Sequence, residues 1–384
     1  MRTIINSPRS RKAAGEGNTG LESLLGSRIV GQPSAVGSIV PYVQMYQAGL
    51  APEGRPAGVF LLMGPSGTGK TRTVEALAGV LHGSEKNILR VDCGEFQMEH
   101  EVAKLIGAPP GYLGHRETQP MLTQAKLNGL TSDRSSLAIV LFDEIEKAAP
   151  SMARLLLGVL DKATLRLGDN NVVNFERSLI FMTSNLGARE MMREINPDFG
   201  FQSVTGTGAG DVSRKLESIG LHAMRRRFSP EFINRIDAVV TYQPLDRESL
   251  SAILDHQLTE LQSHIDTRLG PRGFALEVSQ ASQEFLLSRG TSSQYGAREL
   301  KRTLHRQVTQ PIAAMVADGK AGPGGTLCID LAEEGDSLAF EFIPDPAPDS
   351  GPDEDEFDLP PPRTPRGLRR SSLGDVPRRP LKAA

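Results

Sequence analysis

The chain has 384 residues, of which 39% are hydrophobic, and a formal charge of −3. This length is enough for two packed domains, and the small net charge predicts no specific nucleic-acid partner. The two cysteines, Cys93 and Cys328, lie far apart without metal-ligand spacing, which argues against a disulfide framework and fits a reducing compartment. No apolar run approaches the roughly 18 residues that cross a bilayer, and no apolar stretch follows the amino-terminal bases, so we expect a cytoplasmic protein that binds no membrane.

Residues 1–20 are polar, basic and glycine-containing, and we expect them to form a disordered arm. Over residues 21–243, apolar runs typical of strands alternate with helical patterns, which predicts a parallel sheet covered by helices. The predicted strands are Val59–Met63, Ile88–Val91, Leu137–Phe142, Ser178–Thr183 and Ala238–Tyr242. This range is therefore interpreted as one large α/β domain.

A phosphate-binding motif follows the first predicted strand. Eight residues fit the pattern G-x-x-x-x-G-K-[ST] at every specified position: Gly64, Pro65, Ser66, Gly67, Thr68, Gly69, Lys70 and Thr71. The glycines let successive backbone N–H groups face one concavity, and the helix predicted over Thr73–Leu81 adds the partial positive charge of its amino terminus. We expect Lys70 to reach the β- and γ-phosphates of a nucleotide and the Thr71 hydroxyl to bind Mg²⁺.

A pair of carboxylates ends the third predicted strand. Asp143 and Glu144 follow Leu137–Phe142, a continuous apolar run typical of a strand buried on both faces of a parallel sheet. The carboxyl ends of such strands are where ligands bind in open α/β sheets. We expect Asp143 to orient Mg²⁺ or its water shell, and Glu144 to polarise the water that attacks the γ-phosphate.

With these two motifs in place, the chain closely resembles the Clp family of AAA+ unfoldases, in particular the second ATPase module of ClpB- and ClpA-type proteins. The resemblance covers about residues 28–342. Its six motifs, in family order, are Arg28–Gln32, Leu105–Gly114, Leu141–Ala148, Met182–Gly187, Phe228–Asp237 and Tyr295–Leu300. The resemblance implies an α/β fold with a P-loop parallel sheet and flanking helices, followed by a smaller, mostly helical α+β lid domain. It also implies ATP and Mg²⁺ as ligands and a homo-oligomeric ring, a hexamer.

Residues 244–343 have the pattern expected of that lid. Six apolar residues at helical spacing mark one face of a long helix: Leu250, Ile253, Leu254, Leu258, Leu261 and Ile265. Short strands are predicted at Phe274–Val278 and Thr326–Asp330, around two further helices.

Residues 344–384 have the composition of a disordered tail. Pro344–Leu359 carries seven acids and no base, and Arg363–Lys382 carries seven bases and one acid, with many prolines. Such a segment cannot bury a core. The acidic block could fold back on the basic block, or either could tether a partner, but a solvated tail is the favoured interpretation.

The resemblance implies three catalytic residues besides Glu144. Asn185 would position the attacking water, Arg235 would project into the neighbouring subunit's site as an arginine finger, and Arg298 would reach the nucleotide from the lid. Without the resemblance, each residue has a simpler interpretation. Asn185 would be a turn residue, Arg298 would form an ion pair with a nearby acid such as Glu299, and Arg235 would form a surface salt bridge with Asp237. Three neighbouring arginines, Arg225, Arg226 and Arg227, compete with Arg235 for the finger role.

Two further pairs of residues take roles from the resemblance. Ile29 and Val30 would flank the adenine, although alone they would be ordinary core residues. Tyr112 and Leu113 would line the axial pore and contact the substrate polypeptide, with the phenol ring giving sequence-tolerant contact. The alternative is a tyrosine that anchors its own loop.

Two segments depart from the family pattern. His115–Met121 replaces an aromatic, acids and Gly-Gly-Gln-Leu, and Asp161–Ala163 stands where Asp-Asp-Gly is usual. We expect no room in 384 residues for a first ATPase module, a folded amino-terminal domain or a coiled-coil middle domain, which weakens a direct interpretation as a DnaK-dependent disaggregase.

The first functional hypothesis is a ring-forming ATPase that unfolds or remodels protein substrates by threading them through a pore. The alternative is an assembly or regulatory factor that uses ATP as a switch and threads nothing. Phe199–Phe201 lies near the position of the tripeptide that contacts a partner peptidase in some relatives, and its aromatic first residue makes peptidase docking the less favoured expectation.

Overall fold

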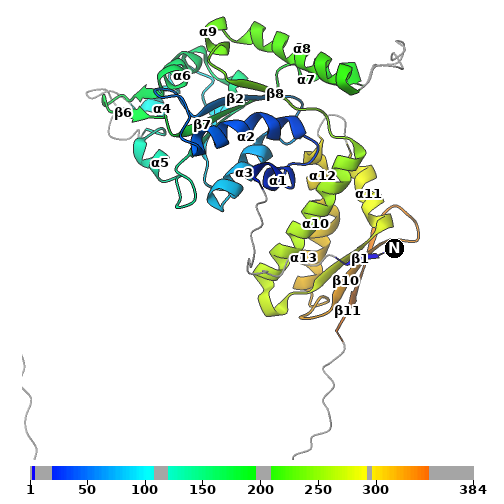
Figure 1. Cartoon of the computed structure of the whole chain (residues 1–384). Coiled ribbons are helices and arrows are strands. Elements are labelled where there is room, and N and C mark those ends of the chain that lie inside the picture. Colours follow the sequence, from blue (N-terminus) through cyan, green and yellow to red (C-terminus); the bar gives the residue numbers. More distant parts are fainter. Residues whose placement is uncertain (1, 5–19, 108–119, 196–208, 292–295, 346–384) are drawn as a thin grey trace, which may run out of the picture. The chain divides into compact units, whose positions relative to one another are not determined.

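The computed structural model describes residues 2–4, 20–107, 120–195, 209–291 and 296–345 (Figure 1). Contacts between residues divide the chain after Pro344, and every helix and strand described lies within Met1–Pro344.

The large domain is built on a five-stranded parallel sheet in the order β3-β4-β7-β2-β8. Its strands are β2 (Gly58–Met63), β3 (Leu89–Asp92), β4 (Ala138–Asp143), β7 (Ser178–Ser184) and β8 (Ala238–Thr241). Every residue of β2, β4 and β7 is buried, because these central strands are flanked by other strands and covered on both faces. All five predicted strands are confirmed, with ends displaced by at most one residue.

Alternation along the strands divides the core of the large domain into two layers. Phe60 and Leu62 of β2 point to one face, where they pack with residues of α1, α2 and α3, whereas Leu61 and Met63 point to the other, with residues of α6, α8 and α9. The predicted helix over Thr73–Leu81 is confirmed within α3. The helices of this domain are α1 (Leu21–Gly26), α2 (Pro33–Gln47), α3 (Lys70–His82), α4 (Ala103–Ile106), α5 (Gln124–Asn128), α6 (Pro150–Lys162), α7 (Ala188–Ile195), α8 (Ala209–Arg227) and α9 (Pro230–Ile233). Short 3-10 turns lie at Cys93–Glu95 and Ile145–Lys147, and a two-stranded sheet is formed by β5 (Thr164–Arg166) and β6 (Val172–Asn174).

The small domain places helices against a four-stranded sheet in the order β1-β9-β10-β11. Its elements are α10 (Arg247–Leu269), a 3-10 turn (Gly270–Arg272), β9 (Ala275–Ser279), α11 (Gln280–Gly290), α12 (Ala297–Leu304), a π-helical turn (His305–Thr309), α13 (Gln310–Ala317), β10 (Thr326–Leu331) and β11 (Leu338–Ile343). The apolar face predicted for the long helix is confirmed in α10, whose Leu250, Leu254, Leu258 and Ile265 are buried in the core of this domain. No helix within the described ranges is both long and apolar enough to cross a membrane.

Two strands of this sheet were not expected. Arg2–Ile4 forms β1, which pairs antiparallel with β9, so the expectation of a disordered arm over residues 1–20 is wrong for these three residues. A polar arm carries no local strand signal, and its pairing is created by the partner strand. The other unexpected strand, β11, is half-exposed and pairs with β10.

Candidate functional site

The phosphate-loop residues connect β2 to α3 in a backbone path that requires glycine. Gly64 has φ +146°, and a Cβ there would lie 2.6 Å from the carbonyl oxygen of Tyr242. Gly69, just before α3, has φ +101°, a conformation that side chains with a Cβ rarely adopt. The loop is closed by Thr68, whose Oγ1 donates to the carbonyl of Pro65 at 2.9 Å.

Lys70 is held against this loop by its ammonium group. Nζ donates to the carbonyls of Gly64 and Pro65, both at 2.8 Å, and to Asn185 Oδ1 at 3.0 Å. Burial lowers the pKa of Lys70 to about 8, and the nearby Glu146 carboxylate opposes this shift. The lysine is therefore placed at the loop where phosphate oxygens bind.

The two carboxylates at the end of β4 are held in different ways. Asp143 is buried, accepts a hydrogen bond from the Thr183 hydroxyl and forms an ion pair with Arg90 of β3. Glu144 takes a left-handed backbone conformation, with φ +57°, and its N–H donates to Thr183 Oγ1 at 2.9 Å. A non-glycine residue in this conformation is strained by about 1–3 kcal/mol, and such strain clusters at functional sites.

Asn185 connects the phosphate loop to the carboxylates. Its Oδ1 accepts from Lys70, and its Nδ2 donates to Glu144 Oε1 at 3.3 Å. The residue follows β7, the strand that lies between β4 and β2 in the sheet. The sheet order therefore brings together three residues that the sequence singled out separately.

The lid contacts the phosphate loop through the start of α12. Arg298 Nη1 donates to Ser66 Oγ at 2.9 Å, and the N–H of Ala297 donates to the carbonyl of Gly67 at 3.1 Å. Glu299 pairs instead with Arg302 and Arg306, so the alternative that Glu299 is the partner of Arg298 is wrong.

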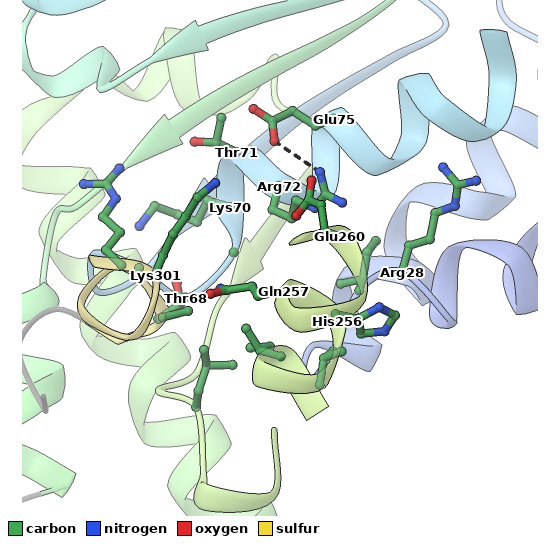
Figure 2. Close-up of a pocket in the computed structure, with 18 of the residues that line it drawn as sticks. Arg28, Thr68, Lys70, Thr71, Arg72, Glu75, His256, Gln257, Glu260 and Lys301 are labelled. Carbon is green, nitrogen blue, oxygen red and sulfur yellow. Dashed lines mark ion pairs between the residues drawn. The ribbon is translucent and has the colours of Figure 1, made fainter. Parts of the chain in front are cut away.

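These elements surround one cavity of about 1030 Å³. It is lined by Ile29 and Val30, by residues 67–72 of the loop, by both carboxylates, by Asn185 and by Arg298. Figure 2 shows Lys70 and Thr71 on one side and Gln257 and Glu260 of α10 on the other. The volume lies at the upper end of the range for small-molecule sites.

The residues present fit a magnesium ion. Thr71 and Asp143 both line the cavity, and hydroxyl and carboxylate oxygens are ligands that Mg²⁺ accepts. Among the residues that the structure describes, no group of three or more His, Cys, Asp or Glu is placed to hold a metal.

Arg235 does not line this cavity. Its Nη1 donates to the carbonyl of Glu231 at 2.8 Å, and its guanidinium forms ion pairs with Glu231 and Asp161. Asp237 instead accepts from the N–H of Val59 at 2.9 Å and pairs with Arg55, so the proposed Arg235–Asp237 pair is wrong. Tyr112, Leu113 and Phe199–Phe201 lie outside the described residues.

Sequence reasoning missed several residues of the site. Gln32 is buried and donates from Nε2 to the carbonyls of Gln243 at 2.8 Å and Thr68 at 3.3 Å. Gln32 and Thr183 lie inside motifs of the family pattern, so the signal for them was available. The polar face of α10 had no signal, because helical periodicity marks only the apolar face that packs in the core. His256, Gln257 and Glu260 of this face line the cavity, beside Ile253 of the predicted apolar face.

Two family models match successive parts of the chain. Residues 55–239 match the AAA domain (Cdc48 subfamily), and residues 245–329 match the C-terminal, D2-small domain of ClpB protein. Together with the geometry above, these matches identify a AAA+ ATPase module over residues 55–329. The order of large and small domain makes it a module of the ClpB type.

Individual relatives agree with this assignment. The chain is 38% identical to the chaperone protein ClpB of Pseudomonas putida, over 83% of this chain and 34% of that protein. It is 34% identical to heat shock protein 104 of Schizosaccharomyces pombe, over 78% of this chain and 31% of that protein. A cryo-EM reconstruction of Hsp104 in a closed state with ATPγS and FITC casein has a TM-score of 0.67 and 27% identity, over 84% of this chain and 51% of that chain. The chain thus spans about a third of the length of these curated relatives.

Proposed function

We propose that this chain is an ATP-dependent protein unfoldase or remodeller that works in the cytoplasm as a homo-oligomeric ring, a hexamer, and threads polypeptide through an axial pore. The observation that carries the proposal is the Asn185 side chain, which joins Lys70 to Glu144 in a cavity that residues of the lid also line. The chaperone names of the relatives and the casein in the Hsp104 reconstruction support protein as the substrate.

The proposed reaction is hydrolysis of the γ-phosphate of ATP. The N–H groups of the loop and the Lys70 ammonium bind the β- and γ-phosphates, and Ile29 and Val30 flank the adenine. Mg²⁺, held by Thr71 and Asp143, would neutralise phosphate charge. Glu144 takes a proton from water as the water attacks the γ-phosphorus, while Asn185 holds that water in place. The bond between the γ-phosphorus and the oxygen that bridges it to the β-phosphate breaks, and ADP and phosphate leave.

Two arginines link this reaction to motion and assembly. Arg298 would couple the state of the nucleotide to the position of the lid, because its guanidinium on α12 contacts the phosphate loop. Arg235 would act on a neighbour's nucleotide, which is supported by its absence from the cavity of its own chain. A guanidinium in that position stabilises the charge that develops on the γ-phosphate.

The first test replaces Glu144 with Gln. The variant keeps the shape of the side chain and loses the charge that polarises water, so ATP binding should persist while turnover falls at least about a hundredfold. Binding is measured with a fluorescent ATP analogue and turnover by phosphate release. Turnover close to that of the wild type would remove Glu144 from the mechanism.

A second test separates threading from the switch alternative. Tyr112→Ala removes the aromatic side chain that would contact the substrate, so ATP turnover should stay near the wild-type rate while unfolding of a tagged, stable model protein stops. Unfolding at the wild-type rate in this variant would contradict the pore-loop assignment. A wild-type protein that hydrolyses ATP but unfolds and remodels nothing would favour the switch. Whether a partner peptidase binds is a separate question, which co-purification from the native cell addresses.

A further inference from the structure

The turn that follows Glu144 is held by Arg227, the last residue of α8. Its Nε and Nη2 donate to the carbonyl of Glu146 at 3.0 and 2.8 Å, and Nη2 also donates to the carbonyl of Ala148 at 2.9 Å. These bonds span the short 3-10 turn Ile145–Lys147. A planar guanidinium can bind two carbonyls in a fixed geometry, which a lysine cannot do. Arg227 therefore fixes the backbone directly after the hydrolytic carboxylate.

The side chain of Glu146 connects this turn to the residue that follows β7. Its Oε1 accepts from the N–H of Asn185 at 3.0 Å. Its Oε2 is buried and has no hydrogen-bond partner in the described part of the chain. A buried carboxylate oxygen without a partner is costly, so the position of Glu146 is imposed by its surroundings. The bonds that Arg227 makes to its carbonyl are part of what imposes it.

The contacts made by Arg227 and Glu146 lead to Asn185, which lies beside Glu144 and Lys70. Asn185, whose N–H is bound by Glu146, uses its side chain to contact both Lys70 and Glu144. Neither Arg227 nor Glu146 lines the cavity. A loss of either side chain would therefore change the geometry of the site without removing a contact to the nucleotide.

We propose that Arg227 and Glu146 are positioning residues for Glu144 and Asn185. Arg227 fixes the turn Ile145–Lys147. The Glu146 side chain on this turn then holds the backbone N–H of Asn185. The Asn185 side-chain amide and the Glu144 carboxylate thereby keep the spacing that hydrolysis needs. The inference rests on the ATP hydrolysis proposed above.

The first experiment compares Arg227→Ala with Arg226→Ala. Arg226 is the preceding residue of the same helix and is exposed, so it is a matched control for loss of charge. Arg227→Ala should lower kcat for ATP about tenfold, because small displacements of reacting groups cost rate steeply. The Kd for ATP should stay within about twofold of wild type, since only positioning in the transition state is lost. Arg226→Ala should change neither value.

A double-mutant cycle tests whether the two residues act in one path. Glu146→Ala should lower kcat about as much as Arg227→Ala, and the double variant should lose little more than either single variant, because residues in one network are not additive. Glu146→Gln keeps an acceptor for the Asn185 N–H, so exchange of that N–H should stay near the wild-type rate, whereas kcat in this variant also reflects the loss of the charge beside Lys70. Fully additive losses would overturn the shared path.

Hydrogen exchange gives a measurement that does not depend on turnover. Without nucleotide, the backbone N–H of Asn185 should exchange faster in Arg227→Ala than in wild type, and Arg226→Ala should match wild type. A folded Arg227→Ala with wild-type kcat and wild-type exchange would overturn the inference. If wild type hydrolyses no ATP, the proposed function fails, and the exchange result still decides this inference. If Arg227→Ala does not fold, Arg227→Lys takes its place, with a partial loss expected.

Discussion

At the scale of the residue, His82 shows how one buried side chain makes stability depend on pH. It lies in the last turn of α3, where its Nδ1 is 3.0 Å from Ser132 Oγ. Its side chain is largely buried. Burial lowers the pKa of His82 below its ordinary value of 6.5, because a charged imidazole would lose its hydration.

The sign of the effect follows from proton binding. Between the lowered folded-state pKa and 6.5, the unfolded chain binds more protons than the folded chain, so stability falls as pH drops through this window. We expect the difference in Tm between pH 7.5 and pH 5.5 to be smaller in His82→Gln than in wild type, because the variant cannot be protonated. Differential scanning calorimetry at the two pH values measures this. An unchanged difference would mean that other groups account for the acid sensitivity.

At the scale of the element, the start of α12 depends on a close backbone approach. Gly296 has φ +49°, and a Cβ there would lie 2.9 Å from the carbonyl oxygen of Gly67 in the phosphate loop. The next residue, Ala297, donates its N–H to that same carbonyl. The contact between the lid and the loop therefore depends on a residue without a side chain.

Gly296→Ala should weaken ATP binding, because the strain of about 1–3 kcal/mol at this backbone conformation and the clash with Gly67 both push α12 off the loop. Gly319→Ala is the matched control, since Gly319 has φ +70° with no atom near its Cβ position. The control should lower Tm without changing the Kd for ATP. Calorimetric titration of both variants decides the point, and equal ATP affinity in the two would show that the contact is not needed for binding.

At the scale of the whole molecule, the two halves of the proposed hydrolytic site lie on different parts of one chain. Glu144 lines the cavity, whereas Arg235 follows α9 and is bound by Glu231 and Asp161 away from it. In the proposed ring, each interface would bring the cavity of one copy together with the Arg235 of the next.

Mixing two inactive variants tests that arrangement. Arg235→Ala and Glu144→Gln should each be nearly inactive alone, and their mixture should regain part of the ATP turnover. Some interfaces of a mixed ring then hold an intact Glu144 on one side and an intact Arg235 on the other. Turnover is measured across mixing ratios, with the oligomeric state checked by light scattering. A wild-type protein that stays monomeric with ATP and still hydrolyses it at full rate would contradict the assignment.

Local pattern predicted much of the large domain. The five strands of its parallel sheet were found to within one residue, because four of them are mostly apolar runs and β3 has apolar residues on both sides of Arg90. The phosphate loop could be read directly, since its glycines and its lysine are contiguous. The amino-terminal strand β1 was missed because a polar arm gives no continuous apolar signal. The edge strand β11 was missed although Leu338, Phe340 and Phe342 share its more buried face, which is the alternation typical of a half-buried strand.

The sequence by itself determined which residue types are present and the order in which strand, loop and helix deliver them. The tertiary structure alone decided which of them meet: Arg90 with Asp143, Arg227 with the Glu146 carbonyl, and α10 with the cavity. The physical reason is that these partners are separated by many residues of chain. Their contacts follow from strand order and helix packing, which no local periodicity records.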